Sequence, residues 1–235
     1  MLETKTITYR DGETHLTGFL AADPAAGQRP GVLVVHGGAG LDDHAKGRAR
    51  RLAALGLVAF ACDMYGEGVM GNRERVMGCI SQLRNDPPSL FRRTQVGIEV
   101  LKAHPLIDGR IAAVGYCFGG MTVLELARSG ADLLGVVSVH GSLETKRPAE
   151  PGSIKCKILV LHGALDPHVP LSHLHSFEEE MIRSGADWQL FMYGAAMHGF
   201  THEAAIGQQP GVAYHALTDT RSFEAIRSFL AELFS

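Results

Sequence analysis

The sequence predicts an α/β fold: a mostly parallel central sheet with helices on both faces, preceded by an N-terminal β-hairpin. Short runs of Val, Leu and Ile that are apolar at nearly every position alternate with longer segments of helical periodicity. That alternation is typical of parallel strands buried on both faces. Polar and apolar residues alternate between Thr4 and Ala21 around Asp11-Gly12, which indicates the hairpin.

The elements follow one another in regular order. Strands are expected at residues 31–35, 57–62, 111–116, 135–139, 157–161 and 188–193. Helices are expected at residues 43–55, 89–104, 118–129, 171–184 and 218–234. Asp42 is placed to cap the first helix, and Gly56 follows its end. Residues 66–78 and 144–153 show neither pattern and are expected to be loops, so the chain is predicted to be one domain spanning residues 1–235.

Composition and charge exclude several classes of function. The formal net charge is −3 and no basic block stands out, which argues against nucleic acid or an anionic membrane as a partner. The N-terminal residues lack an apolar leader, and no apolar run reaches the length of a membrane span. We therefore expect a cytoplasmic protein, monomer or homodimer, that acts on a small-molecule substrate.

The cysteines are the first candidates for chemistry. They are widely spaced and form no Cys-x-x-Cys pair, which favours reduced thiols that either pack or react: Cys62, Cys79, Cys117 and Cys156. Cys117 lies in the sequence GYCFGG at residues 115–120, between an expected strand and an expected helix. This G-x-C-x-G pattern is typical of a nucleophile elbow with cysteine in place of serine. The following helix N-terminus would favour a thiolate, whereas a small buried side chain in a glycine-rich turn is the structural alternative.

A nucleophile at an elbow needs a base, and the base needs an orienting acid; in this topology the chain order is nucleophile, acid, base. Asp166 follows the strand at 157–161, and His198 lies in the last long loop, so Cys117, Asp166 and His198 fit that order. His202 competes with His198 for the base. His162 and His168 flank Asp166, but their spacing matches no common zinc pattern, so no metal site is predicted.

A second glycine-rich turn, HGGAG at residues 36–40, follows the strand at 31–35. Such a turn can direct backbone N–H groups at a developing negative charge, so we expect an oxyanion hole formed by the amides of Gly38 and Phe118. The turn lacks the usual G-x-G-x-x-G form and a GK[ST] ending, which argues against a nucleotide-binding loop.

Together these motifs make the chain resemble the dienelactone hydrolase family of α/β-hydrolases. The resemblance runs from about Gly31 to the C-terminal helix and rests on HGGAG at 36–40, CDMYG at 62–66, GYCFGG at 115–120, HGALD at 162–166 and MHGF at 197–200. It implies an α/β-hydrolase fold, a Cys-His-Asp triad, no metal, no organic cofactor, and hydrolysis of lactones or esters through an acyl-thioester.

Two positions depart from the founding enzymes of the family. Their Glu after the first core strand corresponds here to Gly37, and an Arg that holds the substrate carboxylate corresponds to His202. Both differences argue against a carboxylated dienelactone as substrate. A further set of residues near strand ends is expected to line the substrate pocket: His36, Gly37, Met64, Tyr65, Phe200 and His202.

The resulting hypothesis is a promiscuous hydrolase of small esters or lactones. Hydrolysis of neutral phosphotriesters by the same cysteine is an alternative, because the same groups could attack phosphorus. An alternative of another class is a non-catalytic binding protein on a retained hydrolase fold.

Overall fold

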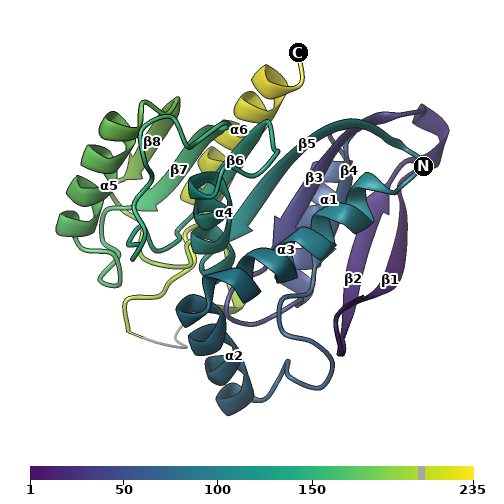
Figure 1. The fold of residues 1–235 in the computed structure, drawn as a ribbon, viewed down its shortest axis with the longest axis horizontal. Coiled ribbons are helices and arrows are strands. Elements are labelled where there is room, and N and C mark those ends of the chain that lie inside the picture. Colours follow the sequence, from purple (N-terminus) through teal and green to yellow (C-terminus); the bar gives the residue numbers. More distant parts are fainter. Residues whose placement is uncertain (206–209) are drawn as a thin grey trace. The chain divides into compact units, whose positions relative to one another are not determined.

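The computed structural model describes residues 1–205 and 210–235, drawn in Figure 1. The chain divides into two compact units, Met1–Ala113 and Val114–Ser235. Strand β5 (Ile107–Tyr116) begins in the first unit and ends in the second. The single-domain assignment stays a prediction, and each unit is described by itself.

The strands of the first unit begin with the predicted hairpin. β1 (Glu3–Asp11) and β2 (Thr14–Ala22) pair antiparallel across a turn in which Gly12 has a φ of 58°, a left-handed conformation that glycine adopts without strain. β2 pairs antiparallel with β4 (Val58–Cys62), and β4 pairs parallel with β3 (Arg29–Val35). Every residue of β3 and β4 is buried, which is why residues 30–35 and 58–62 carry no polar side chain.

Helices cover both faces of these strands. A Cβ on Gly97 of α3 (Pro87–Lys102) would lie 3.0 Å from Cys62 Cβ and 3.5 Å from Leu33 Cδ1, so these side chains face α3. Side chains alternate along a strand. The neighbours Val32 and Val34 therefore face the other side, where α1 (Asp43–Ala53) packs on β2, β3 and β4. Asp42 caps α1 as predicted, accepting the Ala45 N–H at 3.0 Å.

Part of the expected loop at residues 66–78 is helical, which corrects the sequence prediction. Helix α2 (Arg73–Asn85) begins after Asn72, whose side chain accepts the Arg75 N–H. Of the residues of α2, all of which the structure describes, Leu83 alone is buried. Met77 is 56% exposed. An amphipathic pattern this weak is hard to detect because so little of the helix is buried.

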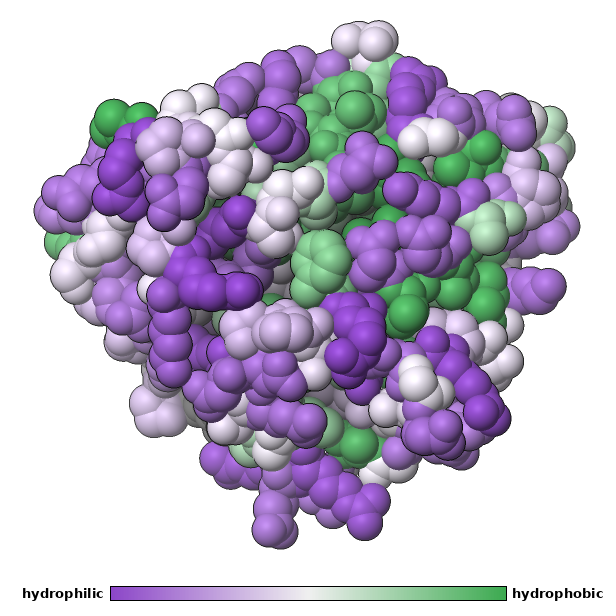
Figure 2. Space-filling view, viewed as in Figure 1, coloured by the Kyte–Doolittle hydropathy of each residue, from purple (hydrophilic) through white to green (hydrophobic). Residues whose placement is uncertain are grey.

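Figure 2 shows a largely hydrophilic face on which hydrophobic groups reach the surface.

The second unit carries the end of β5 and three further strands, β6 (Gly135–Val139), β7 (Lys157–Gly163) and β8 (Trp188–Tyr193), with parallel pairing from β6 to β8. Gly120 of α4 (Phe118–Arg128) approaches Ser138, whereas Gly135 approaches Leu233 of α6 (Ala216–Leu233). Since residues 135 and 138 point to opposite faces of β6, α4 and α6 cover opposite faces. α5 (Leu171–Ser184) contacts β8 through Phe177 and Trp188.

The described strands thus form a mixed, eight-stranded sheet in the order β1-β2-β4-β3-β5-β6-β7-β8. Short 3-10 turns lie at Pro24–Ala26 and Glu203–Ala205. This arrangement confirms the predicted α/β fold, with a parallel centre, an N-terminal hairpin and helices on both faces. None of the described helices combines the length and apolarity that a membrane span requires.

Candidate active site

Cys117 lies at the sharp turn between β5 and α4. Its φ of 54° and ψ of −112° are unusual for a residue with a side chain, and such a conformation costs about 1–3 kcal/mol, which the surrounding structure must supply. The Cys117 N–H donates to Val139 O at 2.9 Å, and its carbonyl accepts the Met121 N–H at 3.2 Å. The thiol is thereby held at the N-terminus of α4, where the helix dipole favours a negative charge.

Glycines make this turn sterically possible. A Cβ on Gly115 would lie 1.9 Å from Gly119 O, and a Cβ on Gly120 would lie 2.8 Å from Gly141 Cα. No side chain fits at these distances, so the strand, the turn and the helix can pass this closely only with glycine. The G-x-C-x-G pattern therefore has a steric explanation in the structure.

The structure brings the three side chains of the predicted triad together. His198 Nε2 lies 3.1 Å from Cys117 Sγ, and His198 Nδ1 lies 2.8 Å from Asp166 Oδ2. Asp166 is 5% exposed, and its Oδ1 accepts the His168 N–H at 2.8 Å. The His198 N–H donates to Gly211 O at 3.1 Å, which fixes the backbone that carries the imidazole.

The charges of these groups support one another. Burial lowers the pKa of His198, but hydrogen bonds to Asp166 and Cys117, and their negative charges, raise it to about 10. Burial raises the pKa of Asp166, yet the hydrogen bond and charge of His198 and the His168 N–H bring it below its usual value. At neutral pH the imidazole is therefore protonated between a carboxylate and a sulfur, an arrangement that favours the thiolate.

The other cysteines lack this environment. Cys62 and Cys156 are buried, and Cys79 is half-buried in α2. Burial raises the pKa of all three thiols, that of Cys156 to about 11. Such thiols stay protonated and unreactive at neutral pH.

The competing histidines have other positions. His168 is exposed, and its ring meets the His198 ring edge-to-face at 5.2 Å between centroids. His162 is 2% exposed, and burial lowers its pKa. His202 is half-buried and donates its backbone N–H to Gly199 O. His198 is thus the histidine that contacts both Cys117 and Asp166.

Sequence reasoning missed His140, which follows β6 with a φ of 40°. Its Nε2 lies 2.9 Å from Thr201 Oγ1, and its ring centroid lies 5.4 Å from that of His198. Its N–H donates to Leu161 O, while the preceding Val139 O accepts the Cys117 N–H. The end of β6 therefore connects the segments that carry all three triad residues. A His-Gly pair at the end of an apolar run was the available signal, and the same pair follows β3 at 36–37 and ends β7 at 162–163.

The predicted oxyanion amides belong to different units: Gly38 lies after β3, and Phe118 is the first residue of α4. Their pairing stays a prediction. Three residues expected to line the pocket are instead core residues, because a side chain with 0% exposure offers no surface to a substrate: His36, Met64 and Phe200. Tyr65 is 4% exposed, whereas Gly37 and His202 are half-buried.

The sequence and the fold of this chain are similar to those of known proteins. The sequence model of the dienelactone hydrolase family matches residues 16–234. The solved structure named m3DLH is 40% identical, with a TM-score of 0.93 over 100% of this chain and 99% of that chain. The dienelactone hydrolase-like promiscuous phosphotriesterase P91 from metagenomic libraries is 39% identical, with the same TM-score and coverage.

A shorter match extends to an animal protein. An uncharacterised protein from Caenorhabditis elegans is 35% identical over 150 residues, which cover 61% of this chain and 93% of that protein. The family match covers nearly the whole chain, and the two solved structures share its fold from end to end. The chain therefore belongs to the dienelactone hydrolase family and is a hydrolase that acts on ester bonds.

Proposed function

We propose that Cys117, His198 and Asp166 hydrolyse carboxylic esters or lactones of small molecules through an acyl-thioester. The supporting observation is the continuous chain of contacts from sulfur to imidazole to carboxylate, 3.1 Å and 2.8 Å long. A nucleophile, a base within hydrogen-bonding reach and a buried orienting acid are the components that nucleophilic catalysis requires.

The proposed reaction has two halves. The Cys117 thiolate attacks the carbonyl carbon, the amides of Gly38 and Phe118 stabilise the oxyanion, and the His198 imidazolium protonates the departing alkoxide. Neutral His198 then removes a proton from water, the hydroxide cleaves the thioester, and Cys117 leaves as thiolate beside the reprotonated imidazole. Water is the only co-substrate, so the steps need no metal or organic cofactor.

The substrate we propose is neutral, and the specificity broad. By comparison with the founding enzymes of the family, Gly37 stands in place of a Glu, and His202 in place of the Arg that would hold a carboxylated substrate. An imidazole is a weaker anchor for an anion than the planar, always charged guanidinium of arginine. We also propose a cytoplasmic location, a monomer or homodimer, and neither nucleic acid nor membrane as a partner.

A second candidate activity is hydrolysis of neutral phosphotriesters. It is supported by the 39% identity and end-to-end structural similarity to the phosphotriesterase P91. In this reaction the Cys117 sulfur would form a bond to phosphorus and release an aryloxide. Water would then cleave the sulfur–phosphorus bond to give a phosphodiester.

The test compares p-nitrophenyl esters, lactones and paraoxon as substrates for the wild type and for Cys117→Ala and Cys117→Ser. We expect ester hydrolysis by the wild type, none above background with Cys117→Ala, and loss of activity in step with iodoacetamide alkylation of Cys117. Full activity of Cys117→Ala would refute the proposal. Absence of paraoxon turnover in an esterase-active wild type would refute the second candidate alone.

A further inference from the structure

His36 is buried beneath the glycine-rich loop after β3, and both of its ring nitrogens have backbone partners. Its Nε2 lies 3.0 Å from the Met64 N–H, which can only donate, so Nε2 accepts. The proton of the neutral ring is therefore on Nδ1, which donates to Gly37 O at 2.8 Å. Burial lowers the pKa of His36, which keeps the ring neutral and the two roles fixed.

The carbonyl of Gly37 is held by further donors. It also accepts the Gly40 N–H at 3.2 Å, and the Tyr65 hydroxyl lies 3.3 Å from both the Gly37 and the Gly38 carbonyl oxygens. A peptide bond is planar and trans, so the C=O of residue 37 and the N–H of residue 38 point in opposite directions. Fixing the Gly37 carbonyl therefore fixes the direction of the Gly38 N–H. Within the described part of the chain no hydrogen bond occupies that N–H, and Gly38 is half-buried.

We propose that His36 is a positioning residue that orients the Gly38 amide toward the oxyanion, an inference that rests on the function proposed above. His36 does not touch the substrate; it acts through the peptide between Gly37 and Gly38. A preorganised donor stabilises developing charge without reorganisation at the moment of reaction, and that is where most of its catalytic value lies.

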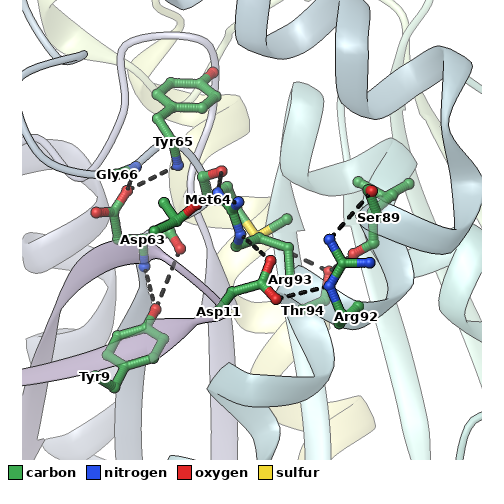
Figure 3. A network of polar contacts seen from close by, with 12 residues as sticks. Tyr9, Asp11, Asp63, Met64, Tyr65, Gly66, Ser89, Arg92, Arg93 and Thr94 are labelled. Atoms are coloured by element: carbon green, nitrogen blue, oxygen red, sulfur yellow. Dashed lines mark hydrogen bonds and ion pairs between the residues drawn. The ribbon is translucent and has the colours of Figure 1, made fainter.

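A polar network, shown in Figure 3, holds Met64, the partner of His36. Arg93 Nη1 donates to Met64 O at 2.9 Å, and Arg93 Nε pairs with Asp11 Oδ2 at 2.7 Å. The next turn is fixed by Asp63, whose Oδ1 accepts the N–H groups of Tyr65 and Gly66 at 2.9 and 3.1 Å. Met64 is thus held on its N–H side by His36 and on its carbonyl side by Arg93, so His36 has a rigid support.

Two reactions of the same cysteine separate positioning of the amide from general support of the fold. Ester hydrolysis needs both the thiolate and the oxyanion hole, whereas alkylation by iodoacetamide forms no oxyanion and needs only the thiolate. We would measure kcat and KM for a p-nitrophenyl ester, and the alkylation rate of Cys117, in His36→Asn and His36→Phe. His104→Asn, at a half-buried histidine with one backbone contact, is the matched control.

We expect kcat to fall about 100-fold in His36→Phe, the loss typical of an oxyanion donor. The fall should be about 10-fold in His36→Asn, which keeps a donor near Gly37 O. KM and the alkylation rate should stay within about twofold, and His104→Asn should match the wild type. Equal losses in hydrolysis and alkylation, or unchanged kcat in His36→Phe, would overturn the inference.

Tyr65→Phe covers the case in which the buried His36 variants do not fold. Loss of one neutral hydrogen bond, about 1 kcal/mol, corresponds to roughly a fivefold lower kcat with unchanged alkylation. An unchanged kcat there, with His36 variants unfolded, would overturn the inference and leave His36 a core residue. Failure of the proposed function is seen separately, as a wild type that hydrolyses no ester.

Discussion

Replacing Asp166 by Asn tests the electrostatics of the triad. The side chains are nearly equal in size, and Asn can still bond to His198 Nδ1, so the variant mainly removes a charge 2.8 Å from the imidazole. At an effective dielectric constant of about 20, that contact is worth roughly 6 kcal/mol of gross attraction. One pKa unit is about 1.4 kcal/mol, so the gross effect on the pKa of His198 is about 4.

The net effect should be about half of this, because the charge also carries a desolvation cost that disappears with it. His198 must be protonated to donate to a leaving alkoxide, so activity on an ethyl ester is lost as pH rises through the pKa of His198, about 10. We expect this alkaline limb of kcat/KM to move down by about 2 pH units in Asp166→Asn. At pH 7, kcat/KM should fall at least 100-fold, because Asn can also stabilise the wrong tautomer.

The assay quantifies the released acid by chromatography between pH 5 and pH 11, with Asp187→Asn, an exposed carboxylate, as the control. A p-nitrophenyl ester serves as a second substrate, since its leaving group departs without a proton and its alkaline limb should be weaker. An alkaline limb at the same pH in Asp166→Asn and the wild type would refute the assignment of His198 as the acid oriented by Asp166.

Three further predictions concern the supports of the site. Gly115→Ala should cost at least about 4 kcal/mol of folding free energy, visible as loss of the cooperative thermal transition, because its Cβ would lie 1.9 Å from a carbonyl oxygen; a native-like melting curve would contradict this. His140→Phe keeps a ring but removes the bond to Thr201, so kcat/KM should fall about 10-fold with a nearly unchanged Tm; equal activity would show that the bond has no positioning role. Burial raises the pKa of Asp11, but the ion pairs with Arg93 and Arg92 lower it overall. The stabilisation of the fold by these ion pairs is therefore present above pH 4 and is lost as the pH falls through the lowered pKa. Asp11→Asn should cost roughly 2–4 kcal/mol at pH 7 and progressively less as the pH falls below 4, measured by urea denaturation. An equal cost at pH 7 and pH 3 would exclude the ion pair as the cause.

Chain order and strand ends were sufficient to predict which three side chains the fold brings into contact. In a parallel sheet the residues just after each apolar run gather at one edge, so Cys117, Asp166 and His198 could be identified without coordinates. The start of α3 was also readable, since Asp86 precedes two prolines and caps the helix, yet the predicted helix began two residues after Pro87.

Other features depend on tertiary partners that a linear pattern does not show. His36 was expected in the pocket because it follows a strand, but the Met64 N–H and the Gly37 carbonyl hold it inside. His140 was overlooked because its partner Thr201 is 61 residues away. Helix α2 was missed because packing, rather than periodicity, holds it to α3.

The close approach of Gly120 and Gly141 limits how this enzyme can diversify. Where two backbone segments approach this closely, no residue with a side chain fits. Substitutions at these glycines are therefore excluded in natural variants and in engineered ones alike. Side chains such as Met70 and Met77 are more than half exposed, so replacing them meets no such steric limit. Sequence change in this protein is therefore confined to positions outside the turn, and the path of the backbone around Cys117 stays the same.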